Sequence, residues 1–195
     1  MVRVDFITNR FFSSRTYIIS CDGCNDVCIV DCGDTDVVVE SYAKSKNIKC
    51  VLLTHTHADH IYGLNRLVEL FPEVKVYSNR FGSEALSSSR LNLTRYHEEV
   101  PDFEMLHKEN ICVVDEGVRI ELFNGVYADV FSTVGHDASC LTYKIDRYLF
   151  TGDSYMPGMP VVAKFPKSDK IQAVNSEMRI KDLAENLVVC PGHTL

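Results

Sequence analysis

The segment 54–60 reads Thr-His-Thr-His-Ala-Asp-His and places three imidazoles and one carboxylate within six residues. These are metal-ligating residue types, in the pattern H-x-H-x-D-H. In an extended loop, residues i and i+2 point the same way, so His55 and His57 can converge on one metal ion. Asp59 and His60 fall at the expected start of a helix and point elsewhere, toward a second ion. The segment therefore predicts a site for two metals.

Two metal ions need more ligands than one segment supplies, and three further candidates occur later in the chain. They are His136 in Val-Gly-His, Asp153 in Thr-Gly-Asp and His193 in Pro-Gly-His. Each follows an expected strand and is directly preceded by glycine, which lets the backbone turn sharply and present the next side chain. Because α/β proteins gather ligand sites at strand ends, we expect these three residues to join the 54–60 segment in one site.

The order H-x-H-x-D-H, G-H, T-G-D and P-G-H resembles the motif set of the metallo-β-lactamase superfamily. The resemblance covers nearly the whole chain. It implies an α+β fold, the four-layer αββα sandwich, with the metals at one edge. It also implies two ligand sets and a bridging carboxylate: His55, His57 and His136 for the first metal; Asp59, His60 and His193 for the second; and Asp153 as the bridge.

Two further aspartates are candidates for orienting the metal ligands by hydrogen bonds without binding the metal themselves. Asp31 lies in Ile-Val-Asp-Cys-Gly, which resembles the family's usual I-D-x-G strand end. Asp137, beside His136, is expected either to orient an imidazole or to be an ordinary loop residue.

Among the subfamilies, glyoxalase II resembles this site but carries a glutathione-binding helical domain after its last histidine, where the printed sequence has two residues. The segment 91–106, with Met-Pro-Gly after T-G-D, is most similar to small bacterial glyoxalase-type hydrolases of unassigned substrate.

Imidazole and carboxylate ligands suit zinc best here, and iron and manganese also fit. Metals lower the pKa of bound water toward 7 and so supply hydroxide at neutral pH. We therefore expect hydrolysis of a small acyl substrate (ester, thioester, lactone or amide) by a bridging hydroxide, with Asp59 orienting it and carrying its proton. The alternative is a sulfur oxygenase similar to the persulfide dioxygenases, with one iron on His55, His136 and Asp153, a facial triad.

Residues 87–110 form a polar stretch with no clear period, and we expect it to select the substrate. Loops supply the walls of such sites, and long irregular connections are often functional or mobile. Tyr96 could offer a hydroxyl to the substrate, and Arg95 or Arg90 could bind a carboxylate. The histidines that belong to no motif are expected at the surface or on a lid, with contact to the substrate as the alternative: His97 and His107.

Hydrophobic periodicity predicts the elements that position these residues. The run 48–54 is almost entirely apolar, which indicates a strand buried on both faces. Strands and helices follow each other in both halves, so two packed sheets with helices outside are expected in a single domain, 1–195. Strands are predicted at 2–7, 16–20, 26–32, 48–54, 75–78, 111–114, 118–123, 126–132, 140–145, 148–151 and 187–190, and helices at 37–46, 61–71 and 169–185.

Composition narrows the classes of partner. The chain has 27 acidic and 20 basic residues and a formal charge of −7, so nucleic acid is an unlikely partner. No run reaches the roughly 18 apolar residues of a membrane span. The first eight residues carry no secretory signal. A small-molecule substrate, no membrane partner and a cytoplasmic location are expected.

Eight cysteines are many for this length, and four of them fall within 21–32. A C-x2-C pair followed by two more cysteines could indicate a zinc or iron–sulfur site. The spacing favours a hairpin instead, with Cys21 and Cys28 on strands flanking an Asp22-Gly23 turn and with Cys28 and Cys32 on one face. All eight are expected to be free thiols that act as small apolar residues.

Overall fold

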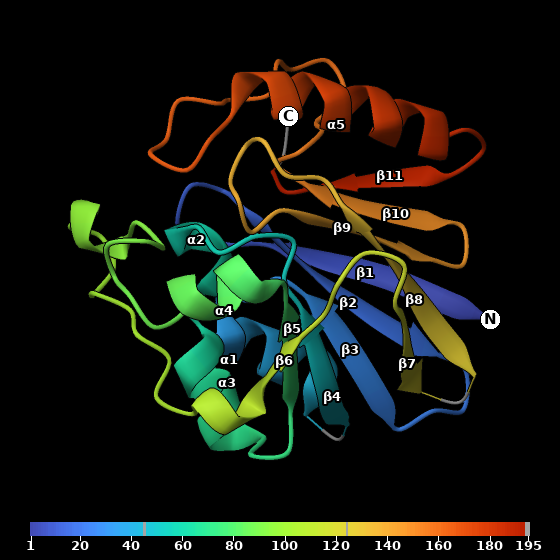
Figure 1. Ribbon diagram of the computed structural model, residues 1–195. Helices are drawn as coiled ribbons and strands as arrows, with labels where there is room; N and C mark the ends of the chain where they lie inside the picture. The colour runs from blue at the N-terminus through green and yellow to red at the C-terminus, as the bar shows by residue number, and fades with distance from the viewer. Residues whose placement is uncertain (45, 124, 194–195) are drawn as a thin grey trace.

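The computed structural model describes residues 1–44, 46–123 and 125–193, and its strands form two sheets that pack face to face (Figure 1). The strands of the first sheet, in spatial and chain order, are β1 (Val2–Thr8), β2 (Arg15–Cys21), β3 (Asp26–Val30), β4 (Asn47–Leu52), β5 (Lys75–Ser78) and β6 (Ile111–Val113). The first three strands pair antiparallel, and β3 to β6 pair parallel.

The second sheet has five strands and joins the last strand to the four before it. In spatial order these are β11 (Val188–Pro191), β10 (Tyr148–Gly152), β9 (Leu141–Ile145), β8 (Val126–Ser132) and β7 (Arg119–Phe123). Only β10 and β11 pair parallel, and the other pairs are antiparallel. The parallel pair brings the chain after β11 to the edge where β10 also ends.

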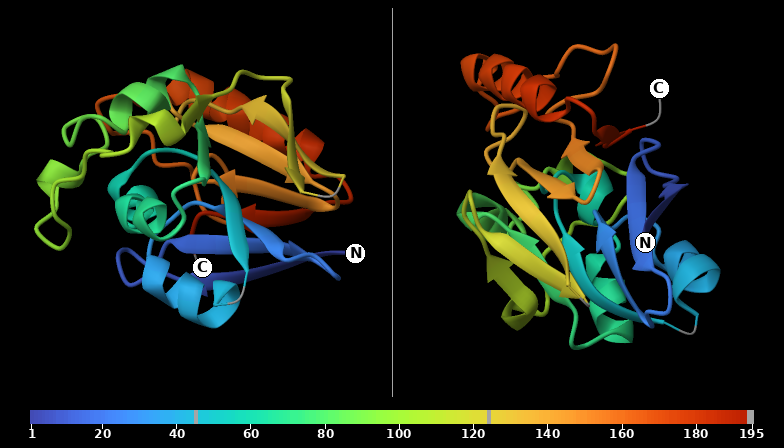
Figure 2. Two further views of the ribbon diagram at one scale, coloured as in Figure 1. Left: turned by 90° about the horizontal axis from the view of Figure 1, so that it is seen from below. Right: turned by 90° about the vertical axis from the view of Figure 1, so that its right-hand side faces the viewer.

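Helices cover the outer faces of both sheets, so that the layers run helix, sheet, sheet, helix (Figure 2). The helices are α1 (Thr35–Val38), the π-helix η1 (Val39–Ala43), α2 (Ala58–Ile61), α3 (Leu64–Leu70), α4 (Arg80–Ala85), α5 (Lys170–Leu183) and the 3-10 turns η2 (Thr94–Tyr96) and η3 (Lys108–Asn110). This is the αββα sandwich expected from the sequence. Within the described residues, no helix is both long and apolar enough to cross a membrane.

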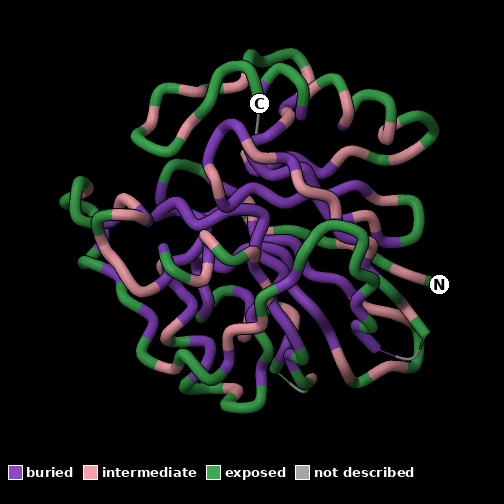
Figure 3. Tube along the Cα trace, in the orientation of Figure 1, coloured by how far each residue is buried: buried purple, intermediate pink, exposed green. Residues whose placement is uncertain are grey.

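Successive residues of β3 and β4 alternate between two apolar cores. Ile29 and Val51 pack in the core beneath α1 and α3, whereas Val30 and Leu52 pack in the core between the sheets. The alternation follows from the two-residue period of a strand. Burial on both faces explains the nearly continuous apolar sequence from Cys50 onward, and much of the chain between the two sheets is buried in Figure 3.

The strand expected over 26–32 ends at Val30, because Asp31 adopts the left-handed conformation with φ of 60°. This conformation is uncommon for a residue other than glycine, and it interrupts the alternation of the strand. Cys28 lies between the sheets, whereas Cys32 lies in the core under the helices. The prediction that these two cysteines share a face is therefore wrong.

The predicted helices are found with changed boundaries. The helix expected over 61–71 begins earlier and is divided by a turn into α2 and α3, and the one expected over 37–46 is found as α1 and η1, with residue 45 outside the described residues. The sequence reasoning missed α4, whose N-cap is Asn79 with its side chain accepting a hydrogen bond from the Gly82 amide at 2.8 Å. An N-cap asparagine is a known helix signal, but only one turn and a half of helix follows it.

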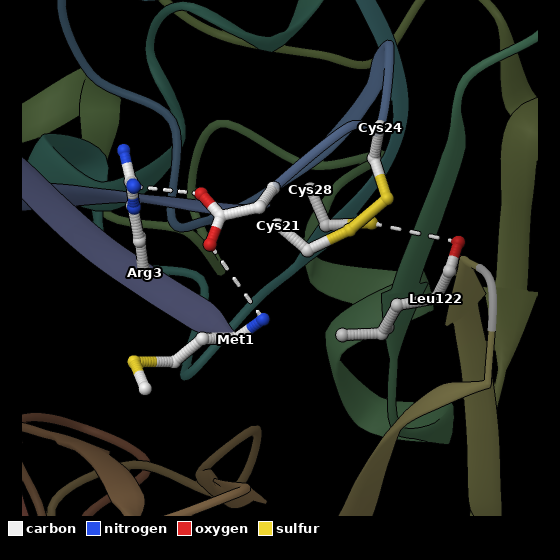
Figure 4. The surroundings of a disulfide bond; sticks show 7 residues. Met1, Arg3, Cys21, Cys24, Cys28 and Leu122 are labelled. Atoms are coloured by element: carbon white, nitrogen blue, oxygen red, sulfur yellow. Dashed lines mark hydrogen bonds and ion pairs between the residues drawn. A yellow bond between two sulfur atoms is a disulfide. The ribbon is translucent and has the colours of Figure 1, made fainter.

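Cys21 and Cys24 are joined by a disulfide across the turn between β2 and β3 (Figure 4). The expectation of free thiols is wrong for this pair. Gly23 takes a φ of 75° in the turn, and the two Cα atoms approach to 5.5 Å, within the range that a disulfide bridges. The other six cysteines are free: Cys28, Cys32, Cys50, Cys112, Cys140 and Cys190.

This pairing predicts a thiol count. Protein denatured without a reductant should react with six equivalents of a thiol reagent, matching the six free cysteines, and with eight after reduction. The double variant Cys21→Ser with Cys24→Ser serves as the control and should give six in both conditions. Eight equivalents from unreduced wild-type protein would contradict the disulfide.

Candidate metal centre

The strand ends at one edge of the two sheets carry all seven side chains that the sequence identified as candidate ligands. The backbone emerging from each strand projects them toward a common region. Their positions are His55 and His57 in the loop after β4, Asp59 and His60 in α2, His136 after β8, Asp153 after β10 and His193 after β11.

Three of these histidines form a first cluster. One ligand atom from each of His55, His57 and His136 lies within 4.8 Å of the other two. His57 Nδ1 and His136 Nε2 are 3.0 Å apart, and all three side chains are buried. The sequence assigned these same residues to one metal.

A second cluster combines Asp59, His60 and His193, again with one ligand atom of each within 4.8 Å of the others. His60 Nε2 lies 3.3 Å from Asp59 Oδ2 and 3.4 Å from His193 Nε2. Burial favours the neutral acid, but the imidazoles of His60 and His193 hold the pKa of Asp59 well below its ordinary value. The cluster therefore presents a carboxylate at neutral pH.

Asp153 lies between the two clusters. Its Oδ2 atom is 3.6 Å from His136 Nε2 in the first cluster and 3.3 Å from His193 Nε2 in the second. Its other oxygen, Oδ1, is buried and has no hydrogen-bond partner within the described residues. A carboxylate placed in this way can reach both clusters, as the resemblance implied for a bridging ligand.

The orientation of the imidazoles fits a metal ion in each cluster. His136 Nδ1 donates to the Val162 carbonyl at 2.7 Å, and His193 Nδ1 donates to the Phe12 carbonyl at 3.0 Å. With the Nδ1 proton engaged, a neutral imidazole presents the lone pair of Nε2. These lone pairs face other ligand atoms within the clusters, and His55 Nε2 is buried without a partner. Facing lone pairs need a cation between them, and metal-binding histidines are held in this manner.

Burial and charge give the two clusters opposite pKa shifts. Burial lowers the pKa of His136 to about 4 and holds that of His55 well below its ordinary value, because a charged ring there would lose its hydration. Burial acts the same way on His60 and His193, but neighbouring carboxylates outweigh it. They raise the pKa of His60 well above its ordinary value and that of His193 to about 9.

These shifts predict that acid weakens the two metal sites unequally. The raised pKa values of His60 and His193 favour their protonated forms in the metal-free chain, so a metal binding there must displace protons, and its affinity falls as pH falls. The imidazole of His136 stays neutral until pH approaches its pKa of about 4. Competition with a chromophoric chelator between about pH 8 and pH 6 should therefore show one equivalent weakening more steeply. Equal slopes for both equivalents would contradict the assignment.

Asp31 supports the second cluster from the end of β3. Its Oδ1 accepts the Thr54 amide at 2.8 Å, and its Oδ2 accepts the Thr54 hydroxyl at 2.8 Å. Oδ2 also lies 2.8 Å from His60 Nδ1, which fixes the ring with Nε2 toward the cluster. The left-handed backbone at Asp31 is thus accompanied by three buried polar contacts. The sequence indicated Asp31 but not Thr54, because a single threonine before a motif carries no specific signal.

Asp137 stands behind the first cluster, with Oδ2 at 3.6 Å from His57 Nε2, beyond hydrogen-bond distance. Its Oδ1 accepts both the amide and the hydroxyl of Ser139. The Ser139 hydroxyl in turn accepts the Thr56 amide at 3.0 Å. Asp137 therefore braces the loop that carries His57 more than it orients the ring directly.

Two of the glycines before the ligands are required by close packing. Gly152 has a φ of 50°, and a Cβ there would collide with the side chain of Thr54. A Cβ at Gly192 would collide with Asp153 Oδ1 and press on the ring of His60. The space beside Gly152 is occupied by Thr54, which holds Asp31, and the space beside Gly192 is occupied by two candidate ligands.

A cavity of about 190 Å³ opens above the clusters. Five predicted ligands form its floor. Leu93 and His97 in its walls belong to residues 87–110, the stretch expected to select the substrate, and Ala58 lies within the 54–60 motif. The sequence did not indicate Phe12, Val162 and Phe165. Apolar wall residues are scattered along the chain and have no periodic signal that marks them as a site. The wall residues are Phe12, Ala58, Leu93, His97, Val162 and Phe165.

The side chains expected to contact the substrate lie outside this cavity. Tyr96 is 60% exposed and lines a neighbouring pocket of about 510 Å³ together with Arg90. The two pockets share Leu93 and Phe165. Arg95 is exposed. A role for Tyr96 or Arg95 therefore requires a substrate that extends beyond the cavity above the clusters.

The sequence is similar to those of several hydrolases. It is 26% identical over 166 residues to the hydroxyacylglutathione hydrolase of Enterobacter sp. (strain 638), covering 85% of this chain and 56% of that protein. It is 28% identical over 180 residues to the enzyme of the same name from Buchnera aphidicola subsp. Schizaphis graminum, covering 91% of this chain and 60% of that protein. The chain thus spans under two thirds of the length of these relatives.

Solved structures share the fold at lower identity. BLEG-1 B3 metallo-beta-lactamase superposes with a TM-score of 0.88 at 20% identity, over 99% of this chain and 92% of that one. The protein TTHA1623, solved in a di-iron-bound form, superposes with a TM-score of 0.81 at 19% identity, over 98% of this chain and 92% of that one.

The model of the metallo-beta-lactamase superfamily matches residues 9–193. This range includes every candidate ligand, the second sheet, and every strand of the first sheet except β1. The chain belongs to the metallo-beta-lactamase superfamily.

Proposed function

We propose that this protein is a metal-dependent hydrolase that cleaves a small acyl substrate at a dinuclear centre. The observation that carries the proposal is the pair of ligand clusters with Asp153 between them. Zinc is the metal that the imidazole and carboxylate donors favour, with iron and manganese as the other fits. The proposed ligands are His55, His57 and His136 for one ion, Asp59, His60 and His193 for the other, and Asp153 for both.

Bound metals would supply the chemistry by polarising the acyl carbonyl and lowering the pKa of water. The chain's own side chains hold the geometry. Asp59 is the proposed group that orients the attacking oxygen and takes its proton, because it is ionised at neutral pH and its carboxylate lines the cavity. Asp31 fixes the ring of His60, and Asp137 braces the loop of His57.

A small substrate is supported by the size of the cavity, about 190 Å³. The relatives named hydroxyacylglutathione hydrolase support an acyl compound over a phosphodiester. The formal charge of −7 argues against a nucleic acid partner. We also propose that residues 1–195 form one domain, as their two sheets share an apolar core.

The test measures metal content and hydrolysis on the same preparation. Protein purified without chelators is analysed by mass spectrometry for zinc, iron and manganese, and then screened against uncharged esters, thioesters, lactones and amides. Two ions per chain and loss of turnover on chelation support the proposal. One iron per chain with thiol-dependent oxygen uptake would contradict it and support the mononuclear sulfur oxygenase instead.

A further inference from the structure

The cavity above the clusters has an apolar wall with one exception. Of its six wall residues, five are apolar, and only His97 carries a polar side chain. The floor is already formed by the proposed ligands. Any part of a substrate that lies away from the reacting carbonyl therefore meets Phe12, Leu93 and their apolar neighbours, or it meets His97.

His97 is held at the mouth of the cavity by two aromatic rings. Its imidazole packs edge-on against Phe11, with centroids 5.4 Å apart, and against Phe12, with centroids 5.1 Å apart. Phe12 has a φ of 51°, an unusual conformation for an aromatic residue, and its carbonyl accepts the hydrogen bond from His193. The backbone that positions His97 is thus joined directly to a proposed ligand.

The ring nitrogens of His97 have no hydrogen-bond partner in the described part of the chain, although the ring is only partly exposed. The other polar side chains that line the cavity are those of the proposed ligands. The chain has seven histidines, of which five are proposed ligands. The other two are His97 and His107. The Nδ1 atom of His107 lies 3.4 Å from Glu109 Oε1, and this side chain lines a different pocket. His97 is therefore the one histidine in the cavity that is free to bind a substrate.

We propose that His97 donates a hydrogen bond to the leaving oxygen of the substrate and selects oxygen esters and lactones over thioesters. This inference rests on the proposed hydrolase function. The carbonyl must enter toward the floor to be attacked, which leaves the departing atom toward the wall, where His97 carries the one polar side chain among the described lining residues. Oxygen accepts a hydrogen bond from imidazole well, whereas a thioester sulfur is a weak acceptor.

The reaction balances without a proton from His97. Water adds to the carbonyl carbon, the bond from that carbon to the leaving oxygen breaks with its electron pair on the oxygen, and the proton given up by water ends there. The products are an acid and an alcohol. A hydrogen bond from His97 stabilises the charge that develops on the leaving oxygen, so it acts most strongly as that bond breaks.

The test compares a phenyl ester and the S-phenyl thioester of one acyl group, chosen as the best in the substrate screen. His97→Phe keeps the ring in the aromatic contacts but removes the donor. We expect kcat/KM for the ester to fall by about 10-fold to 100-fold, the range that a hydrogen bond to a charged atom provides. For the thioester we expect a change within about 3-fold. His97→Gln, which restores an N–H donor, should recover most of the ester activity.

His107→Phe is the matched control, since it removes the histidine that lines a different pocket, and it should leave both rates unchanged. Metal content is measured for every variant. An equal loss on ester and thioester, no loss on either, or wild-type activity confined to thioesters would overturn the inference while leaving the hydrolase standing. Failure of the metal-loaded wild type to hydrolyse any member of the screen would overturn the proposed function itself.

Discussion

His57→Ala should lose the metal of the first cluster and lower hydrolysis by about 1,000-fold or more, because a catalytic metal supplies several kcal/mol of transition-state stabilisation. His57 is one of three imidazoles in that cluster, and its Nδ1 lies 3.0 Å from His136 Nε2. Removing it leaves only His55, His136 and the shared carboxylate of Asp153 from the proposed ligand set of the first ion. Metal analysis and kcat/KM on the best substrate are the two measurements.

His107→Ala is the control for this variant, since that side chain is 43% exposed and belongs to neither cluster. It should keep full metal content and full activity. The proposed ligand set would be wrong if His57→Ala retained both metals and the wild-type rate.

Asp31→Ala should lower both the stability of the fold and the metal affinity of the second cluster. The carboxylate is buried, and its loss leaves the Thr54 amide, the Thr54 hydroxyl and His60 Nδ1 without an acceptor. Each buried donor left unsatisfied costs about 1–3 kcal/mol, so the free energy of unfolding should fall by several kcal/mol. Loss of the group that orients a metal-binding imidazole typically weakens metal binding by about 10-fold to 100-fold.

Asp34→Ala provides the comparison, because Asp34 is also buried but accepts its hydrogen bonds from the amide and guanidinium of Arg10, away from the clusters. It should destabilise the fold without changing metal affinity. Denaturant unfolding of the metal-free proteins and chelator competition separate the two effects. If Asp31→Ala weakened metal binding no more than Asp34→Ala did, the carboxylate would have only a structural role.

Most of the fold follows from local patterns in the sequence. Two-residue alternation and apolar runs located the strands, including the short β5 and β6, because β-branched and apolar residues between polar turns mark a strand locally. The seven candidate ligands could also be predicted. Four share the local spacing of the 54–60 segment, and the other three each follow a strand and a glycine, in an order that resembles the motif set of the family. The left-handed conformation of Asp31 could not be predicted from the sequence, because contacts with Thr54 and His60 in a distant segment hold its φ at 60°.

The residues that form the walls of the cavity could not be predicted from local sequence patterns either. Phe12, Leu93, Val162 and Phe165 lie in segments far apart in the chain and converge only when both sheets have assembled. Apolar side chains have no residue type that distinguishes a wall from a core. His97 could be singled out only by elimination, as a histidine outside the motifs, and its place in the cavity required the structure.

The contact of His193 with the Phe12 carbonyl joins two residues that are 181 positions apart in the sequence. Residues so far apart can meet only once both sheets have assembled, so this contact is expected to form late in folding. An ion bound between His193 and its neighbouring ligands would stabilise this contact. With free metal at about 1,000 times its dissociation constant, metal binding would raise the free energy of unfolding by about 4 kcal/mol. Metal depletion would then increase the unfolded fraction of the protein and its degradation by proteases, so that its abundance would fall together with its activity.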